Sequence, residues 1–172
     1  MKIKIQELDK AKNGVSFDYL EDLSHLEQDL NQLISISPVE VKGNAEKTAD
    51  VYEVKGKLAA EMKLKCSRCL SDYDYHIEDE FDELFLPKTV EADSDKENIH
   101  PIDSDEIDIS AIVEEVVFMN IPYIPLCHEE CKGLCPTCGT NLNIETCTCE
   151  PVKVDPRLAD LAKWFDQNGE TE

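Results

Sequence analysis

The clearest pattern in the sequence is an alternation of apolar and polar positions from residue 54 to residue 66. Apolar or small side chains occupy the even positions: Val54, Gly56, Leu58, Ala60, Met62, Leu64 and Cys66. The odd positions hold mostly lysine and glutamate, as expected of a strand that buries one face. After a short break the alternation resumes from Tyr73 to Phe81, now with mostly acidic side chains at the polar positions. We therefore predict a long antiparallel hairpin with Cys66-Ser67-Arg68-Cys69 at its tip, and cross-strand pairing of the lysines with the acids.

The chain before this hairpin predicts shorter elements. Ile3 and Ile5 alternate with lysines, which predicts a first strand within residues 1–8. Residues 17–33 fit two patterns, because their start resembles a strand whereas the later leucines have helical spacing. A further alternation begins at Val39, after a proline break.

The chain after the hairpin predicts two helices. An apolar stripe with helical spacing runs through residues 105–119, and Asp108 or Ser110 can cap it. A second helix is expected over residues 155–169, with an Asp-Pro start and an Asn-Gly end. Residues 88–98 lack an apolar period and carry several acids, so we expect a surface loop there, with an acidic docking segment as the alternative.

Six of the eight cysteines lie between Leu126 and Cys149. Cys135-Pro136-Thr137-Cys138-Gly139 is a zinc-knuckle sequence, in which two thiolates and nearby backbone N–H groups can turn toward one cation. Cys135 and Cys138 can close on Cys147 and Cys149 through a short loop, which leaves Cys127 and Cys131 to join the CxxC at the hairpin tip. We therefore predict two four-sulfur sites, each holding one Zn²⁺. The first site consists of Cys66, Cys69, Cys127 and Cys131, and the second of Cys135, Cys138, Cys147 and Cys149. His128 is an alternative to Cys127 as a ligand, although an exposed neighbouring histidine is the simpler interpretation.

Four disulfides are the competing interpretation of eight cysteines, and are usual in small secreted chains. The sequence MKIKIQELDK at the N-terminus has no apolar h-region, and no apolar run reaches the length of a membrane span. We therefore expect a cytoplasmic, reducing environment, in which CxxC pairs favour metal. A thioredoxin-type role would need a CxxC at a strand-to-helix junction, which neither pair has.

These elements together predict an α+β fold, with an antiparallel β-rich domain, a few helices and a C-terminal zinc-binding segment. We place the β-rich domain, with the long hairpin and one helix, at residues 1–120. The cysteine-rich segment and the C-terminal helix fill residues 121–172, and we expect them to pack on the first part. A chain of 172 residues suffices for one core, or for a core with a small appendage.

The formal charge of −21, from 38 acids against 17 bases, opposes general affinity for phosphate backbones. Each Zn²⁺ with four thiolates adds −2, so two filled sites would give about −25, that is −21 plus twice −2. A basic protein partner fits this charge better than bare RNA, although acidity that only maintains solubility is an equal alternative.

Three motifs resemble one family. They are Cys66-Ser67-Arg68-Cys69-Leu70, the run from Leu134 to Asn143 (LCPTCGTNLN), and Asp155-Pro156-Arg157-Leu158-Ala159. Their combination and order resemble the YceD-like family of bacterial proteins, named for large-subunit ribosomal RNA accumulation. The resemblance implies a cytoplasmic role in accumulation or maturation of 23S rRNA, with members often encoded beside a zinc-ribbon protein of the large ribosomal subunit.

We therefore expect a non-enzymatic ribosome-assembly factor that binds a basic ribosomal protein or a pre-ribosomal particle. The alternative is a direct rRNA-binding zinc module, which needs a basic patch near the knuckles. Residues 127–150 disfavour it, because they supply only Lys132 against four glutamates. Catalysis is disfavoured because four-thiolate sites are closed to water, and no motif arranges a nucleophile with a base.

Overall fold

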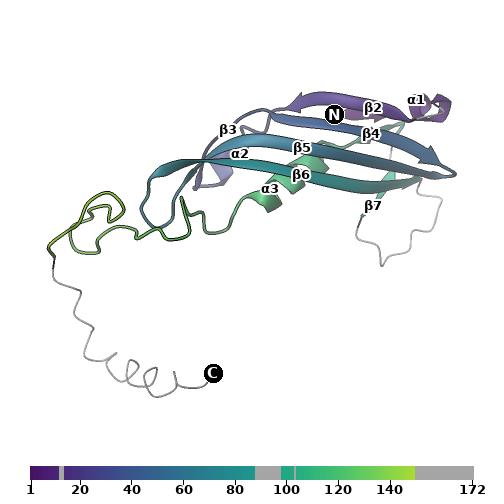
Figure 1. Ribbon diagram of the computed structural model, residues 1–172. Coiled ribbons are helices and arrows are strands. Elements are labelled where there is room, and N and C mark those ends of the chain that lie inside the picture. The colour runs from purple at the N-terminus through teal and green to yellow at the C-terminus, as the bar shows by residue number, and fades with distance from the viewer. Residues whose placement is uncertain (12–13, 88–97, 103, 150–172) are drawn as a thin grey trace, which may run out of the picture.

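The structure is a computed structural model of the chain, and it describes residues 1–11, 14–87, 98–102 and 104–149 (Figure 1). A six-stranded sheet dominates it, with the strand order β2-β4-β5-β6-β7 and with β3 also paired to β5. The strands are β2 (Val15–Glu21), β3 (Leu33–Ile36), β4 (Val39–Thr48), β5 (Val51–Lys65), β6 (Asp72–Pro87) and β7 (Ile99–Ile102). All pairs in this sheet are antiparallel except β6 with β7, which is parallel. Two further strands, β1 (Lys2–Lys4) and β8 (Glu106–Asp108), pair with each other.

The predicted hairpin is confirmed as β5 and β6, which pair from Tyr52 opposite Phe85 to Lys65 opposite Asp72. The even positions of β5 are buried, so the alternation in the sequence does mark a core face. Position 56 lies on that face and favours glycine because the Phe81 ring covers it. A Cβ there would come within 2.4 Å of the Phe81 Cζ atom. The first CxxC lies at the turn between β5 and β6, at one end of the sheet.

The outer face of the hairpin carries the predicted cross-strand charge pairs. Each of four lysines on β5 has an acidic partner on β6: Lys55 with Asp82, Lys57 with Glu80, Lys63 with Asp74 and Lys65 with Asp72. The Nζ–carboxylate distances of the first, third and fourth pairs are 3.2, 3.8 and 3.0 Å. These exposed pairs contribute little to stability individually, but they neutralise the lysine row.

The other face of the sheet forms the core with three helices, α1 (Ile5–Lys10), α2 (Leu26–Asp29) and α3 (Ser110–Asn120). Figure 1 shows α3 lying along this face, where it buries Ile112, Val113 and Val117. No helix in the described part of the chain is long and apolar enough to cross a membrane.

Several predicted boundaries were wrong. The helix expected over 105–119 begins only at Ser110, because Glu106–Asp108 pair with β1 instead. The N-cap position is Ile109, so neither predicted residue occupies it. Asp108 still caps the start of the helix from one residue earlier, because its Oδ1 accepts the Ser110 N–H at 3.0 Å.

The predicted first strand is confirmed only for Lys2–Lys4, since the chain then turns into α1. Residues 17–33 contain both alternatives, because β2 is followed by a single helical turn, α2, and then by β3. The strand expected from Val39 is confirmed as β4.

The predicted loop over 88–98 lies outside the described residues except for its last residue. The predicted helix over 155–169 lies entirely outside them. The helix α3 ends at Asn120, where we placed the domain boundary. The division of the chain into two folding units there stays a prediction.

Candidate metal centres

The structure brings the eight cysteines together in two groups of four. We call Cys66, Cys69, Cys127 and Cys131 the hairpin cluster, and Cys135, Cys138, Cys147 and Cys149 the C-terminal cluster. Within each cluster, all four Sγ atoms lie within 4.8 Å of one another. These are the two groups predicted from the sequence, and each could bind a metal ion.

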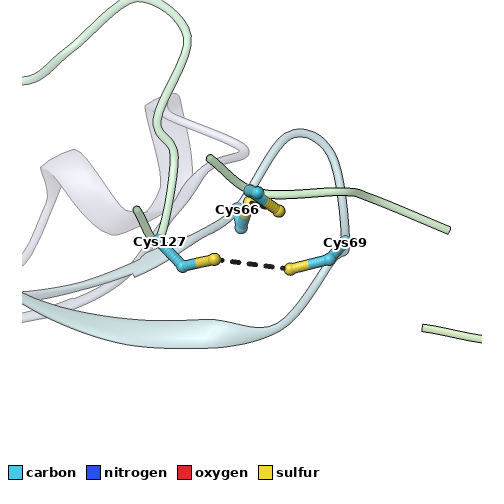
Figure 2. Close-up of side chains that lie close together, drawn as sticks. Cys66, Cys69 and Cys127 are labelled. Atoms are coloured by element: carbon cyan, nitrogen blue, oxygen red, sulfur yellow. Dashed lines mark hydrogen bonds between the residues drawn. The ribbon is translucent and has the colours of Figure 1, made fainter. Parts of the chain in front are cut away.

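The sulfur positions of the hairpin cluster match metal ligation in spacing. Figure 2 shows the Cys69 and Cys127 side chains pointing at each other, with Sγ atoms 3.6 Å apart. The Cys66 and Cys131 Sγ atoms are 3.8 Å apart. Tetrahedral zinc with Zn–S bonds of about 2.3 Å places its sulfurs roughly 3.8 Å apart, whereas a disulfide needs about 2.05 Å. All eight cysteines are free thiols, so the donor set and the spacing both fit a tetrahedral thiophilic metal.

The two CxxC sequences form the same backbone turn. In the hairpin cluster, the Leu70 N–H donates to the Cys66 carbonyl at 2.9 Å and the Cys66 N–H donates to the Ser71 carbonyl at 2.9 Å. In the C-terminal cluster, the corresponding bonds run from Gly139 to Cys135 at 2.9 Å and from Cys135 to the Thr140 carbonyl at 2.8 Å.

The residue after the second cysteine of each turn has a left-handed backbone, with φ of 57° at Leu70 and 74° at Gly139. Glycine adopts this conformation without strain, whereas leucine does not. The sequence therefore builds one knuckle twice, and only the second uses the residue that the turn favours.

Backbone and hydroxyl donors favour the thiolate form in both knuckles. Burial opposes ionisation of Cys66, but N–H groups of Cys69, Cys127 and Arg68 bond to its sulfur and lower its pKa to about 6. The N–H groups of Cys138 and Thr137 likewise lower the pKa of Cys135 to about 6. A thiolate is the form of cysteine that binds metal.

One further sulfur in each cluster, that of Cys127 and that of Cys149, has the opposite tendency. Burial, together with the neighbouring sulfurs, raises the pKa of Cys127 to about 12. Contact with Cys138, followed by burial, raises the pKa of Cys149 to about 12. Four adjacent thiolates repel one another unless a cation lies between them, so each cluster has the electrostatics of a cation site.

The hairpin cluster joins parts of the chain that are far apart in sequence. The Ser67 N–H at the hairpin tip donates to the Pro125 carbonyl at 2.8 Å, and the Arg68 Nη1 donates to the Cys131 carbonyl at 3.1 Å. Cys66, Cys69 and Cys131 are buried and form their own small core. This cluster therefore fastens residues 125–131 to the end of the sheet.

The C-terminal cluster is local and more open. Its four cysteines lie within fifteen residues, counting from Cys135 to Cys149, and Cys138 is exposed. A single bridge between Leu134 and Asn141 closes the loop.

Two asparagines connect the clusters, and sequence reasoning missed both. Asn143 Nδ2 donates to the Cys131 Sγ at 3.3 Å, while the Lys132 N–H donates to Asn143 Oδ1 at 2.8 Å. Asn141 Nδ2 donates to the Ser71 Oγ at the hairpin tip, at 3.2 Å. An amide that donates to a ligand sulfur orients it and stabilises the thiolate. The only signal in the sequence was the Asn-Leu-Asn run directly after the second knuckle.

His128 is the residue proposed as an alternative ligand. Its Nδ1 lies 3.1 Å from the Cys127 Sγ, and its side chain is exposed. The structure thus places His128 beside a cysteine of the hairpin cluster. Among the described residues, both groups of four that could hold one metal ion consist of cysteines alone.

Comparisons with known proteins place the chain in a family. The model of the large ribosomal RNA subunit accumulation protein YceD matches residues 54–164. The chain is 33% identical over 161 residues to the uncharacterized protein YlbN of Bacillus subtilis, which covers 93% of both chains. It is 28% identical over 120 residues to an uncharacterized protein of Mycobacterium tuberculosis, 69% of this chain and 58% of that one.

A third relative comes from a plant. The chain is 44% identical over 55 residues to the chloroplastic large ribosomal RNA subunit accumulation protein YCED homolog 1 of Zea mays, 31% of this chain and 19% of the relative. No solved structure matches the chain. The match to the family model over the hairpin, both clusters and the segment beyond them shows that this chain belongs to the YceD family of large ribosomal RNA subunit accumulation proteins.

Proposed function

We propose that this protein is a non-enzymatic cytoplasmic factor for large-subunit rRNA accumulation, which binds a basic ribosomal protein or a pre-ribosomal particle. The family description supports the process, because it names an accumulation factor for large-subunit rRNA. The proposal concerns how this chain would serve that process.

The observation that carries the binding mode is the neutralised lysine row on β5. Among the described residues, β5 carries a regular row of lysines that could follow a phosphate backbone, yet each of these lysines pairs with an acid on β6. In a chain of net charge −21, little positive surface is then left for counterion release on RNA. The same charge attracts a lysine-rich protein and speeds its association at low salt.

We further propose that each cluster holds one Zn²⁺ with a structural role. Four thiolates saturate tetrahedral zinc and leave no position for water, so such a site contributes folding energy rather than catalysis. In the hairpin cluster the metal would fix the segment after α3 against the sheet. This role agrees with a binding protein whose surface must be held in shape.

The second candidate is direct binding of rRNA, and the lysine row itself favours it. Those lysines would contact phosphates if the acidic partners on β6 moved aside. The two candidates predict opposite responses when these acids are neutralised.

The experiment compares affinities for two probes over a range of salt. Purified large-subunit ribosomal proteins, tested one at a time, and fragments of 23S rRNA are titrated with the full chain. We expect tight binding to at least one basic ribosomal protein that weakens with salt, and weak binding to RNA. Tight binding to RNA with no affinity for any ribosomal protein would overturn the proposed mode.

A pair of matched variants sharpens this comparison. Glu80→Gln with Asp74→Asn frees Lys57 and Lys63, whereas Glu129→Gln with Glu130→Gln makes the same change in net charge away from the lysine row. If the row is an RNA surface, the first variant gains RNA affinity far more than the second. We expect both variants to bind RNA almost as weakly as the wild type.

A further inference from the structure

A short stretch between α3 and the hairpin cluster exposes an unusual number of large apolar side chains. Four of them lie within residues 118–124: Phe118 at 52% exposure, Met119 at 76%, Tyr123 at 93% and Ile124 at 62%. We call these four side chains the linker surface. Scattered exposed apolar residues are normal, but four within seven consecutive residues concentrate exposed apolar area in one short stretch, and such concentrations mark interaction sites.

The linker surface is held in place rather than frayed from the core. Asn120 Nδ2 donates to Asp79 Oδ2 on β6 at 2.6 Å and to the Val116 carbonyl at 2.9 Å, which fixes the end of α3 to the sheet. At the other end, Pro125 is buried and its carbonyl accepts the Ser67 N–H from the hairpin tip. Figure 1 shows the segment after α3 running toward the turn between β5 and β6. The apolar side chains are therefore presented by a backbone anchored at both ends, which lowers the entropic cost of binding.

The charged side chains around this stretch of the sequence are acidic, and one of them, Glu114, lies 3.1 Å from the His25 Nε2 atom through its Oε1. No lysine or arginine occurs between Lys96 and Lys132. On α3, Glu114 and Glu115 precede Phe118 and Met119 by four positions each, so every glutamate lies on the same side of the helix as one of the apolar residues. Two more exposed acids, Glu129 and Glu130, follow the stretch. Across the hairpin tip Arg68 is close by, but its guanidinium bonds to the Cys131 carbonyl.

We propose that the linker surface docks a cationic amphipathic segment of a partner protein, with apolar side chains on the four residues and lysines or arginines against the acidic rim. This inference rests on the proposed function, and names the part of the chain that meets the basic partner. An apolar centre with a charged rim gives both affinity and orientation, because the centre excludes water and the rim steers the partner.

The test compares two double variants of the full chain. Tyr123→Ser with Ile124→Ser removes the most exposed part of the surface and its neighbour. Leu20→Ser with Ile144→Ser removes two exposed apolar side chains elsewhere, at 65% and 77% exposure, and serves as the control. The probe is the basic large-subunit ribosomal protein that binds the wild type most tightly when each is tested alone.

We expect the first variant to weaken binding by roughly tenfold to hundredfold with an unchanged slope against salt, and the control to bind like the wild type. A third variant, Glu114→Gln with Glu115→Gln, should slow association and flatten the salt dependence. Circular dichroism and metal content should match the wild type in all three variants, because the substituted side chains are solvent-exposed or half-buried and none is a cluster ligand.

Four outcomes would overturn the inference. If Tyr123→Ser/Ile124→Ser binds the ribosomal protein as well as the control does, the partner meets another surface, while the proposed function stands. If no ribosomal protein binds even the wild type, the proposed mode and the linker surface both fail. If the wild type is a dimer and the variant a monomer, the occupant is a second copy. If the variant shifts the emission of Trp164, the only tryptophan, without any partner present, the occupant is the chain's own C-terminal segment.

Discussion

The hairpin cluster and the C-terminal cluster use the same knuckle turn and the same four-sulfur donor set, yet they differ in what they connect. The hairpin cluster unites Cys66 with Cys131, and so joins the end of a sheet to a segment that returns after β6, β7, β8 and α3. The C-terminal cluster closes on itself between Cys135 and Cys149. The comparison teaches that the same set of four cysteines can join distant parts of a fold or close a local loop, depending on where the chain places them.

Loss of the hairpin cluster should therefore have the largest effect. In Cys66→Ser the tie between the sheet and residues 125–131 loses a buried ligand and its metal. Structural zinc contributes on the order of 10 kcal/mol of apparent binding free energy to the folded state, so its loss should remove a large part of the free energy of unfolding. We expect thermal unfolding monitored by far-UV circular dichroism to shift down strongly, with the β5–β6 end losing hydrogen-exchange protection.

Loss of the C-terminal cluster should have a smaller, local effect. We expect Cys147→Ser to lose one of two metals and to expose amides of residues 134–149, while the main unfolding transition of the sheet stays near the wild type. Hydrogen exchange read by mass spectrometry separates these regions. An equal drop in melting temperature for Cys147→Ser and Cys66→Ser would show that the two clusters do not differ in role.

The contact of Asn143 with Cys131 sharpens the comparison, because a residue of the C-terminal loop there supports the hairpin cluster. Asn143→Ala should weaken metal binding at the hairpin cluster by roughly tenfold to hundredfold, the range typical of partners that orient a ligand. Competition with a metal chelator measures this effect. Glu145→Ala is the control, since that exposed side chain lies in the same loop. Equal affinities in the two variants would mean that the asparagine contact is dispensable.

The smallest expected effect concerns the left-handed residue of each knuckle. A Cβ at Gly139 would meet nothing within 4 Å, so Gly139→Ala costs only the strain of φ 74°, about 1 kcal/mol. We expect the metal affinity of the C-terminal cluster to fall about fivefold in a chelator titration, with the hairpin cluster unchanged. The hairpin knuckle already carries such strain at Leu70, and Leu70→Gly should be neutral or slightly stabilising there. A gain of affinity on Gly139→Ala would contradict the equivalence of the two turns.

The hairpin and the grouping of the cysteines could be read from the sequence because both depend on local spacing. The period-two pattern from Val54 to Cys66 has one interpretation. Two CxxC pairs and two other closely spaced cysteine pairs leave few groupings that keep the connecting loops short. The charge pairs between β5 and β6 followed from the register of that hairpin.

Features that depend on distant partners were not predictable. The start of α3 moved to Ser110 because β1, more than one hundred residues earlier in the chain, pairs with residues 106–108. The parallel strand β7 (Ile99–Ile102) was missed, since its four residues include a proline and have no clear period. Asn143 was missed as a support of Cys131 because nothing in its spacing reveals which sulfur its side chain reaches.

The most direct test of two separate four-sulfur zinc sites is the native mass of the full chain purified without added metal. We predict the mass of the chain plus two zinc ions for the wild type, and plus one zinc for Cys147→Ser, which keeps the hairpin cluster intact. A metal-free wild type whose mass is reduced by the eight hydrogens of four disulfides would contradict the account, as would a chain that holds a single ion.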